Sequence, residues 1–206
     1  MPTLEQVSRR VFADASWFVK SMVGTFLLIV PGLHFFAFGY VYRFALAGRR
    51  GEVGDMPEWT DWRELFLDGL RCFAIVIVLA GVPLLLGYLA SLPLYPFLGP
   101  PSYLPMVPPF VLGAPLAAAG VYRFQRREEF RDAFRVPVLL HMIVSARRQI
   151  LIPTLAFIGF LFVLSPLFPY ALFTGSVVIF YYYSLAFHQM EVGARAPASE
   201  RSSSRR

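Results

Sequence analysis

Three carboxylates recur at three- and four-residue spacing in one strongly patterned stretch, Met56–Arg71. They are Asp61, Glu64 and Asp68, and on a helix this spacing places them on one face. Several carboxylate oxygens on one face are the ligands that a divalent cation prefers, and paired carboxylates also serve as general acid and base. A helical stripe alone does not enclose a cation. We therefore interpret this face first as a solvated surface, second as a docking surface, and third as a cation or catalytic site.

Aromatic and apolar side chains occupy the other face of the same predicted helix. Trp59, Trp62, Phe66 and Leu70 lie close together on a helical wheel, which is typical of an amphipathic helix at a membrane interface. The helix start is predicted near Asp55, Pro57 and Glu58, and Asp61 with Glu64 matches the spacing of a capping box.

A basic stripe is the predicted partner of the acidic face. Arg127, Arg131 and Arg135 recur every four residues in the segment 123–149, and we interpret that segment as a second amphipathic helix at the interface. The predicted interaction surface therefore has two halves, made of these residues: Trp59, Asp61, Trp62, Glu64, Phe66, Asp68, Arg127, Arg131 and Arg135.

The composition explains why these elements are expected at a membrane. Of the 206 residues 57% are hydrophobic and only 16% are charged, against about 25% charged in soluble proteins. No charged residue occurs in Ser21–Tyr42, Cys72–Tyr122 or Gln149–Met190. Because about 20 apolar residues span a bilayer, the second and third runs each accommodate two crossings, and at least four spans are expected.

The basic residues lie between or outside these runs, and the formal net charge is +6. This placement is typical of the cytoplasmic side of a membrane protein. It argues against nucleic-acid binding and favours contact with the anionic lipids of the inner leaflet. We expect a multi-pass protein of the cell inner (cytoplasmic) membrane with both termini in the cytoplasm.

An internal repeat favours three helical hairpins. Val-Tyr-Arg-Phe occurs at Val41–Phe44 and again at Val121–Phe124, and prolines interrupt each charge-free run. The first run contains Pro31-Gly32 and is predicted to be a broken hairpin or a re-entrant pair, in preference to one kinked crossing.

The predicted fold is thus an all-α integral membrane protein with four full transmembrane helices, a proline-broken N-terminal hairpin and two cytoplasmic amphipathic helices. One domain, residues 1–193, is divided into an interfacial helix (1–20), the broken hairpin (21–46), a cytoplasmic amphipathic segment (47–71), the second hairpin (72–122), the second amphipathic segment (123–149) and the third hairpin (150–192), followed by a disordered basic tail (194–206).

The sequence contains no recognisable catalytic or metal-binding motif. The single cysteine, Cys72, and the histidines His34, His141 and His188 have no spacing typical of a metal site. We expect no metal, no cofactor and no catalytic residue, although a role for any of the three histidines stays open.

Two motifs carry a resemblance to a known family. The first is Pro57-Glu58-Trp59-x-Asp61-Trp62-x-x-Leu65-Phe66-x-Asp68-Gly69-Leu70, and the second is Phe12-x-Asp14-x-x-Trp17-x-x-Lys20. Together with Pro31, Gly39-Tyr40 and Arg43, they resemble the small prokaryotic membrane proteins of the domain-of-unknown-function family numbered four-zero-one-three. The resemblance implies the helical membrane fold and no particular activity.

Three functions are compatible with these residues. The favoured one is a non-enzymatic scaffold, accessory subunit or assembly factor with a protein partner or a second copy in the membrane. The alternative is a protein that binds or transports a lipid or small apolar solute between its hairpins. The third, an enzyme, would need polar side chains to converge at the membrane boundary, and the candidates are Asp61, Glu64, Asp68, His141 and His188.

Overall fold

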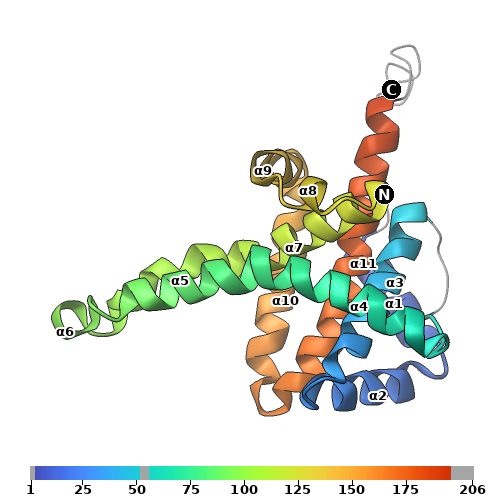
Figure 1. Ribbon diagram of the computed structural model, residues 1–206, viewed down its shortest axis with the longest axis horizontal. Helices are drawn as coiled ribbons and strands as arrows, with labels where there is room; N and C mark the ends of the chain where they lie inside the picture. Colours follow the sequence, from blue (N-terminus) through green and yellow to red (C-terminus); the bar gives the residue numbers. More distant parts are fainter. Residues whose placement is uncertain (1–2, 52–55, 196–206) are drawn as a thin grey trace.

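The computed structural model describes residues 3–51 and 56–195, and the regular elements in these ranges are all helical (Figure 1). They are α1 (Leu4–Ala13), α2 (Trp17–Ile29), α3 (His34–Arg50), α4 (Trp62–Val76), the π-helical turn η1 (Ile77–Gly81), α5 (Val82–Ser91), α6 (Tyr95–Leu98), the 3₁₀ turn η2 (Pro100–Met106), α7 (Val107–Arg127), α8 (Phe130–Ala133), α9 (Val136–Ser145), α10 (Arg147–Val163), the 3₁₀ turn η3 (Ser165–Leu167) and α11 (Phe168–Arg195). The predicted all-helical class is confirmed.

Three helices are long and apolar enough to cross a membrane by length and composition. They are Trp62–Ser91, Pro100–Arg127 and Ser165–Gly193. Two further pairs qualify only when both members of a bent pair are counted together, α1 with α2 across a 95° bend and α9 with α10 across a 94° bend. The described part of the chain therefore has three to five candidate spans, and the fourth predicted crossing, in α10, is not a continuous helix of full length.

Helix α11 forms the centre of the molecule. It packs against α2, α3, α7 and α10, and Figure 1 shows it between α3 and α10. Within its candidate span, 78% of an apolar stretch of 18 residues is buried inside the protein. Large side chains such as Phe173, Tyr183 and Phe187 are almost fully enclosed, so this helix supplies the core.

A long arm leaves this core. Helix α4 continues through η1 into α5, and α6 with η2 turns the chain back into α7; Figure 1 shows the arm extending away from the α10–α11 pair. Only 22% of the corresponding apolar stretch of 18 residues in Trp62–Ser91 is buried. Because the exposed side chains of the arm are mainly apolar, such as Leu85, Leu86 and Phe97, the arm is suited to contact with lipid.

The segments 47–71 and 72–122, predicted as consecutive parts of the chain, are joined by one helix. One helix starts at Trp62 and runs to Ser91 without a break near Arg71. A charged side chain marks where water begins, but it leaves the helical backbone hydrogen bonds intact. The predicted start at residues 55–58 is wrong for the described part, because residues 56–61 are not helical and Asp61 precedes the helix with a φ of 55° and no side-chain cap. The predicted capping box is therefore absent; Asp55 lies outside the described residues.

The predicted amphipathic segment 123–149 is divided among several helices in the structure. Helix α7 continues to Arg127, Glu128 adopts a left-handed φ of 57°, and α8 and α9 follow as separate elements. A residue in this conformation ends a helix, so Arg127, Arg131 and Arg135 do not form one continuous helical stripe. The predicted interfacial helix 1–20 is also divided, since α1 ends at Ala13 and α2 begins at Trp17.

The predicted break in the first charge-free run is present. Helix α2 ends at Ile29, Gly32 has a φ of 86°, and α3 begins at His34. The third predicted hairpin corresponds to α10 and α11, which are joined through η3. Of the predicted tail, residues 194 and 195 belong to the end of α11, and residues 196–206 lie outside the described residues.

Candidate docking surface

The segment between α3 and α4, residues 56–61, is held against the bundle by its backbone; we name it the strap. Lys20 Nζ donates to the carbonyl O of Met56 at 2.8 Å. The Tyr40 hydroxyl donates to the carbonyl O of Pro57, also at 2.8 Å. Both donors belong to buried residues of the preceding helices, so the bonds fix the strap's path.

Lys20 also joins two carboxylates. Its Nζ lies 3.0 Å from Asp14 Oδ2 and 2.7 Å from Glu58 Oε1. The side chains of Lys20 and Asp14 are 6% and 9% exposed, whereas that of Glu58 is 72% exposed. In the turn between α1 and α2, hydrogen bonds from the Ser16 hydroxyl and backbone N–H hold the pKa of Asp14 at about 2. Asp14 is therefore ionised at neutral pH and paired with Lys20.

Arg43 fixes the other end of the strap. Its Nη1 donates to the carbonyl O of Thr60 at 2.8 Å and its Nη2 to that of Asp61 at 3.2 Å. The same guanidinium lies 3.7 Å from Asp68 and 4.0 Å from Glu64. One arginine thus binds the backbone before α4 and faces two carboxylates on α4, which fixes where that helix begins.

The two tryptophans of the strap region have different environments. The ring of Trp59 stacks on that of Tyr40 with centroids 4.3 Å apart, and it also faces Phe173 of α11 at 6.2 Å. Trp62 lies 6.1 Å beyond Trp59 and is 48% exposed. The strap therefore anchors one indole inside and presents the next one outside.

Helix α4 exposes both apolar and acidic groups. Trp62, Phe66 and Leu70 follow one another at four-residue spacing on the common face that the sequence predicted, and all three are exposed. Glu64, whose side chain is 78% exposed, lies on the opposite face of the helix by its spacing and is 4.0 Å from Arg43. Asp68 is turned inward, 20% exposed, between Arg43 and Arg71. The outward surface is thus an aromatic ridge, and the exposed carboxylate of Glu64 lies on a different face of α4.

Helices α3 and α4 cross at two glycines. A Cβ atom at Gly69 would overlap the carbonyl O of Phe35, and one at Gly39 would overlap that of Leu65. Since these obstacles are backbone atoms, they do not move aside as a side chain would. The crossing positions Arg43 over Asp68, and both glycines belong to the motifs that carry the family resemblance.

The predicted arginine partners lie elsewhere. Arg123, Arg127 and Arg135 surround Asp132, at 2.7, 3.3 and 3.5 Å, and Arg131 is exposed on α8. In the described ranges, the ion pairs of the α4 carboxylates are with Arg43 and Arg71. The acidic face of α4 and the basic residues after α7 therefore satisfy their charges separately, because each lies next to a nearer partner.

The internal repeat brings its two copies together. The rings of Tyr42 and Phe124 are 6.4 Å apart, and the Gln125 side chain donates to the carbonyl O of Tyr42 at 2.9 Å. In each copy the arginine faces an aspartate further along the chain, Arg43 facing Asp68 and Arg123 facing Asp132. The sequence analysis did not predict the roles of Lys20, Tyr40 and Asp132. The signal that pointed toward Asp132 was the arginine of the repeated Val-Tyr-Arg-Phe, Arg123 in the second copy.

The histidines do not form a site in the described residues. His34 Nδ1 accepts a hydrogen bond from the Gly32 N–H at 3.1 Å, which explains this histidine in an apolar turn. His141 is exposed on α9, and His188 lies beside Gly51. Between residues 3 and 51 and between 56 and 195, no group of three or more His, Cys, Asp or Glu side chains is placed to hold a metal ion.

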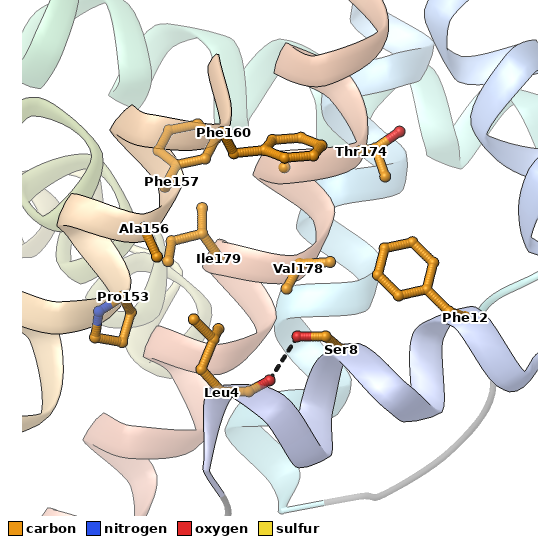
Figure 2. A pocket seen from close by; sticks show the side chains of 11 residues that line it. Leu4, Ser8, Phe12, Pro153, Ala156, Phe157, Phe160, Thr174, Val178 and Ile179 are labelled. Atoms are coloured by element: carbon orange, nitrogen blue, oxygen red, sulfur yellow. Dashed lines mark hydrogen bonds between the residues drawn. The ribbon is translucent and has the colours of Figure 1, made fainter. Parts of the chain in front are cut away.

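Cavities in the bundle are lined by apolar side chains. One of about 190 Å³ lies between α1, α10 and α11, where Figure 2 shows Leu4, Phe12, Phe157 and Val178 around it. The hydroxyl of Ser8 at its edge is engaged, since it donates to the carbonyl O of Leu4 at 2.6 Å. Two further cavities, of about 170 and 270 Å³, lie beside α3 and beside α10. These spaces suit apolar groups.

The fold and its polar contacts define an all-helical membrane protein whose polar side chains hold its own backbone in place. Residues 23–174 match the family described as "Protein of unknown function (DUF4013)". The chain belongs to this family, which confirms the resemblance. Comparison with curated proteins and with solved structures gave no match. The matched region includes the α3–α4 crossing, the strap and the Asp132 cluster.

Proposed function

We propose that the protein is a non-enzymatic scaffold, accessory subunit or assembly factor of a larger membrane complex, and that a partner protein docks on the exposed side of α4. One observation carries this proposal. The strap is fixed through its carbonyl groups, so the side chains of Glu58 and Trp62 are left facing outward on a rigid base.

The chemistry of that surface supports docking over catalysis. A half-exposed tryptophan on the same helix face as Phe66 resembles the aromatic centre of protein interfaces. The polar groups behind it, Lys20 and Arg43, are already engaged with backbone carbonyls and carboxylates. They are therefore not available to bind or activate a substrate.

The proposed topology places this surface at the cytoplasmic boundary of the cell inner membrane. Three of the proposed crossings correspond to the candidate spans Trp62–Ser91, Pro100–Arg127 and Ser165–Gly193, and the fourth to α10; α2 with α3 forms the proline-broken pair. Figure 1 shows the arm running across the direction of α10 and α11, so in this proposal the two helix pairs are tilted differently in the bilayer. The arginines at the ends of α3 and α7 support a cytoplasmic position for those ends, and with it cytoplasmic termini. The start of α4 and the α8–α9 segment are then the two interfacial elements.

A second function, binding of a lipid or small apolar solute, is favoured by the cavity in Figure 2. Its volume of about 190 Å³ exceeds that of apolar protein cavities, roughly 150 Å³, that stay dry and accept benzene. This function requires no partner protein, so one measurement separates it from docking.

Native mass spectrometry of the protein purified from its own membranes in mild detergent is expected to show a second protein subunit bound to it. Trp62→Ala is expected to weaken that complex roughly 30-fold, because an aromatic anchor at an interface contributes about 2 kcal/mol. Glu64→Lys is expected to slow its formation.

Matched controls are Phe97→Ala, which removes an exposed aromatic ring from the arm tip, and Glu5→Lys, which reverses an exposed charge on α1. Both should leave the complex unchanged. A monomer that carries only lipid would refute the docking proposal and support the alternative.

Cysteine labelling tests the topology. In a Cys72→Ala background, cysteines at Arg9 and Arg50 are expected to be protected from an impermeant maleimide on intact cells, whereas one at Phe97 reacts. All three positions are exposed in the structure. Permeabilised cells provide the control, since every site must react there. Labelling of Arg9 and Arg50 on opposite sides would contradict the proposed arrangement.

A further inference from the structure

A second charged cluster lies where α7 ends, around the buried carboxylate of Asp132. This side chain is 3% exposed; it accepts a hydrogen bond from Arg123 Nη2 at 2.7 Å and forms ion pairs with Arg127 Nε at 3.3 Å and Arg135 Nη1 at 3.5 Å. One carboxylate balances only one of three guanidinium groups. The cluster therefore keeps a positive charge.

That charge faces outward. The side chains of Arg127 and Arg135 are 53% and 49% exposed, and Arg131 is exposed between them in sequence. A guanidinium has five N–H donors, and a single atom of each of the first two reaches Asp132. Donors thus remain for another acceptor.

The acidic neighbours reduce this charge without cancelling it. Residues 123–135 contain five arginines and three acidic residues. Of the acidic three, Asp132 is enclosed by the cluster, and Glu128 with Glu129 is exposed on the link between α7 and α8. Arg126 is paired with Glu191 at 2.7 Å. A net charge of +2 remains over this stretch.

An apolar stripe lies next to the cluster. Helix α9 follows Arg135 directly and is bent by 94° from α10, and Figure 1 shows α8 and α9 beside the end of α7. Val136, Leu140 and Val144 are exposed along one side of α9, while Leu139 and Ile143 on the other side are buried. If α10 crosses the bilayer, a helix at this angle lies close to the membrane plane with its apolar stripe toward the lipid.

We propose that Arg127, Arg131 and Arg135 bind the phosphate of an anionic phospholipid from the surrounding bilayer, whose acyl chains lie along the stripe of α9. Planar guanidinium groups match the geometry of a phosphate. Basic pockets beside transmembrane helices are suited to anionic headgroups. Free inorganic phosphate offers the same anion, and an acidic protein segment offers other anions, but neither covers the apolar stripe.

The test is a lipid titration of the full chain in nonionic detergent, followed by native mass spectrometry. Phosphatidylglycerol is expected to bind at least tenfold more tightly than phosphatidylcholine at physiological salt. Arg127→Gln/Arg135→Gln is expected to lose this preference. The control Arg9→Gln/Arg63→Gln removes two exposed arginines elsewhere and should keep it.

Further measurements distinguish the possible sources of the bound anion. Leu140→Ser/Val144→Ser should weaken phosphatidylglycerol binding and leave phosphate binding unchanged if acyl chains occupy the stripe. Displacement of the lipid by millimolar inorganic phosphate would overturn the lipid assignment in favour of a free anion. Equal binding of both lipids, or an unchanged preference in the arginine variant, would overturn the site itself.

The double variant Arg127→Gln/Arg135→Gln is expected to fold, because Asp132 keeps its closest partner, Arg123. The melting temperature checks this. Should it fall, Arg131→Gln replaces it, since the structure shows no ion pair between Arg131 and Asp132. A loss of about threefold in the lipid preference is then the expected result, and no loss would overturn the proposal.

Discussion

Gly69→Ala is expected to prevent α3 and α4 from packing as they do in the structure. The added methyl group would overlap the backbone carbonyl of Phe35, so the two helices must separate. Overpacking a core costs about 1–3 kcal/mol or more, and a backbone obstacle places this variant at the upper end. At about 2–4 °C per kcal/mol for a chain of this size, the melting temperature in detergent should fall by roughly 6–12 °C.

Gly159→Ala is the matched control, because a Cβ atom there meets nothing within 4 Å. Alanine favours a helix over glycine by up to about 1 kcal/mol, so the control should melt at the wild-type temperature or slightly above it. Equal melting of the two variants would contradict the close backbone crossing.

Lys20→Met is expected to be at least as damaging as Gly69→Ala. It removes the cation from Asp14, whose side chain is 9% exposed, and leaves the carbonyl O of Met56 without its donor. Breaking a buried ion pair on one side costs about 3–5 kcal/mol. We therefore expect a loss of melting temperature of roughly 6–20 °C, and faster proteolysis at the strap, residues 56–61.

Two comparisons isolate the cause. Arg9→Met breaks the exposed pair with Glu5 at 2.8 Å, and such pairs contribute about 0–1 kcal/mol, so little change is expected. Adding Asp14→Asn to Lys20→Met should restore part of the stability, because the uncompensated carboxylate is then gone. If the double variant is no more stable than Lys20→Met alone, the ion pair is not what Lys20 contributes.

Local pattern was enough to predict much of the fold. The charge-free runs, the break at Pro31-Gly32 and the repeated Val-Tyr-Arg-Phe all correspond to features of the structure. Each of these features depends on residues that are close in sequence or on apolar side chains, which a membrane-spanning segment requires. That Trp62, Phe66 and Leu70 share one face of a helix was predictable for the same reason.

The polar contacts were less accessible to sequence reasoning. Lys20 binds Met56 of the strap, 36 positions further along the chain. The spacing of apolar and polar residues along a helix does not predict a contact between such distant positions. Charged residues were also poor markers of helix ends, since Arg71 and Arg123 lie within continuous helices. The pairing of acidic α4 with the basic stripe was plausible by charge alone, but Arg43 and Asp132 are nearer partners in three dimensions.

The position of α11 has a consequence for how the protein is made. Helix α11 follows the other described helices in sequence, and it covers residues such as Tyr40 and Phe44 that are synthesised far earlier. Until residues 168–195 emerge, these surfaces must be shielded by lipid or by an insertion factor. A nascent chain stalled before α11 should therefore be a substrate for membrane quality control.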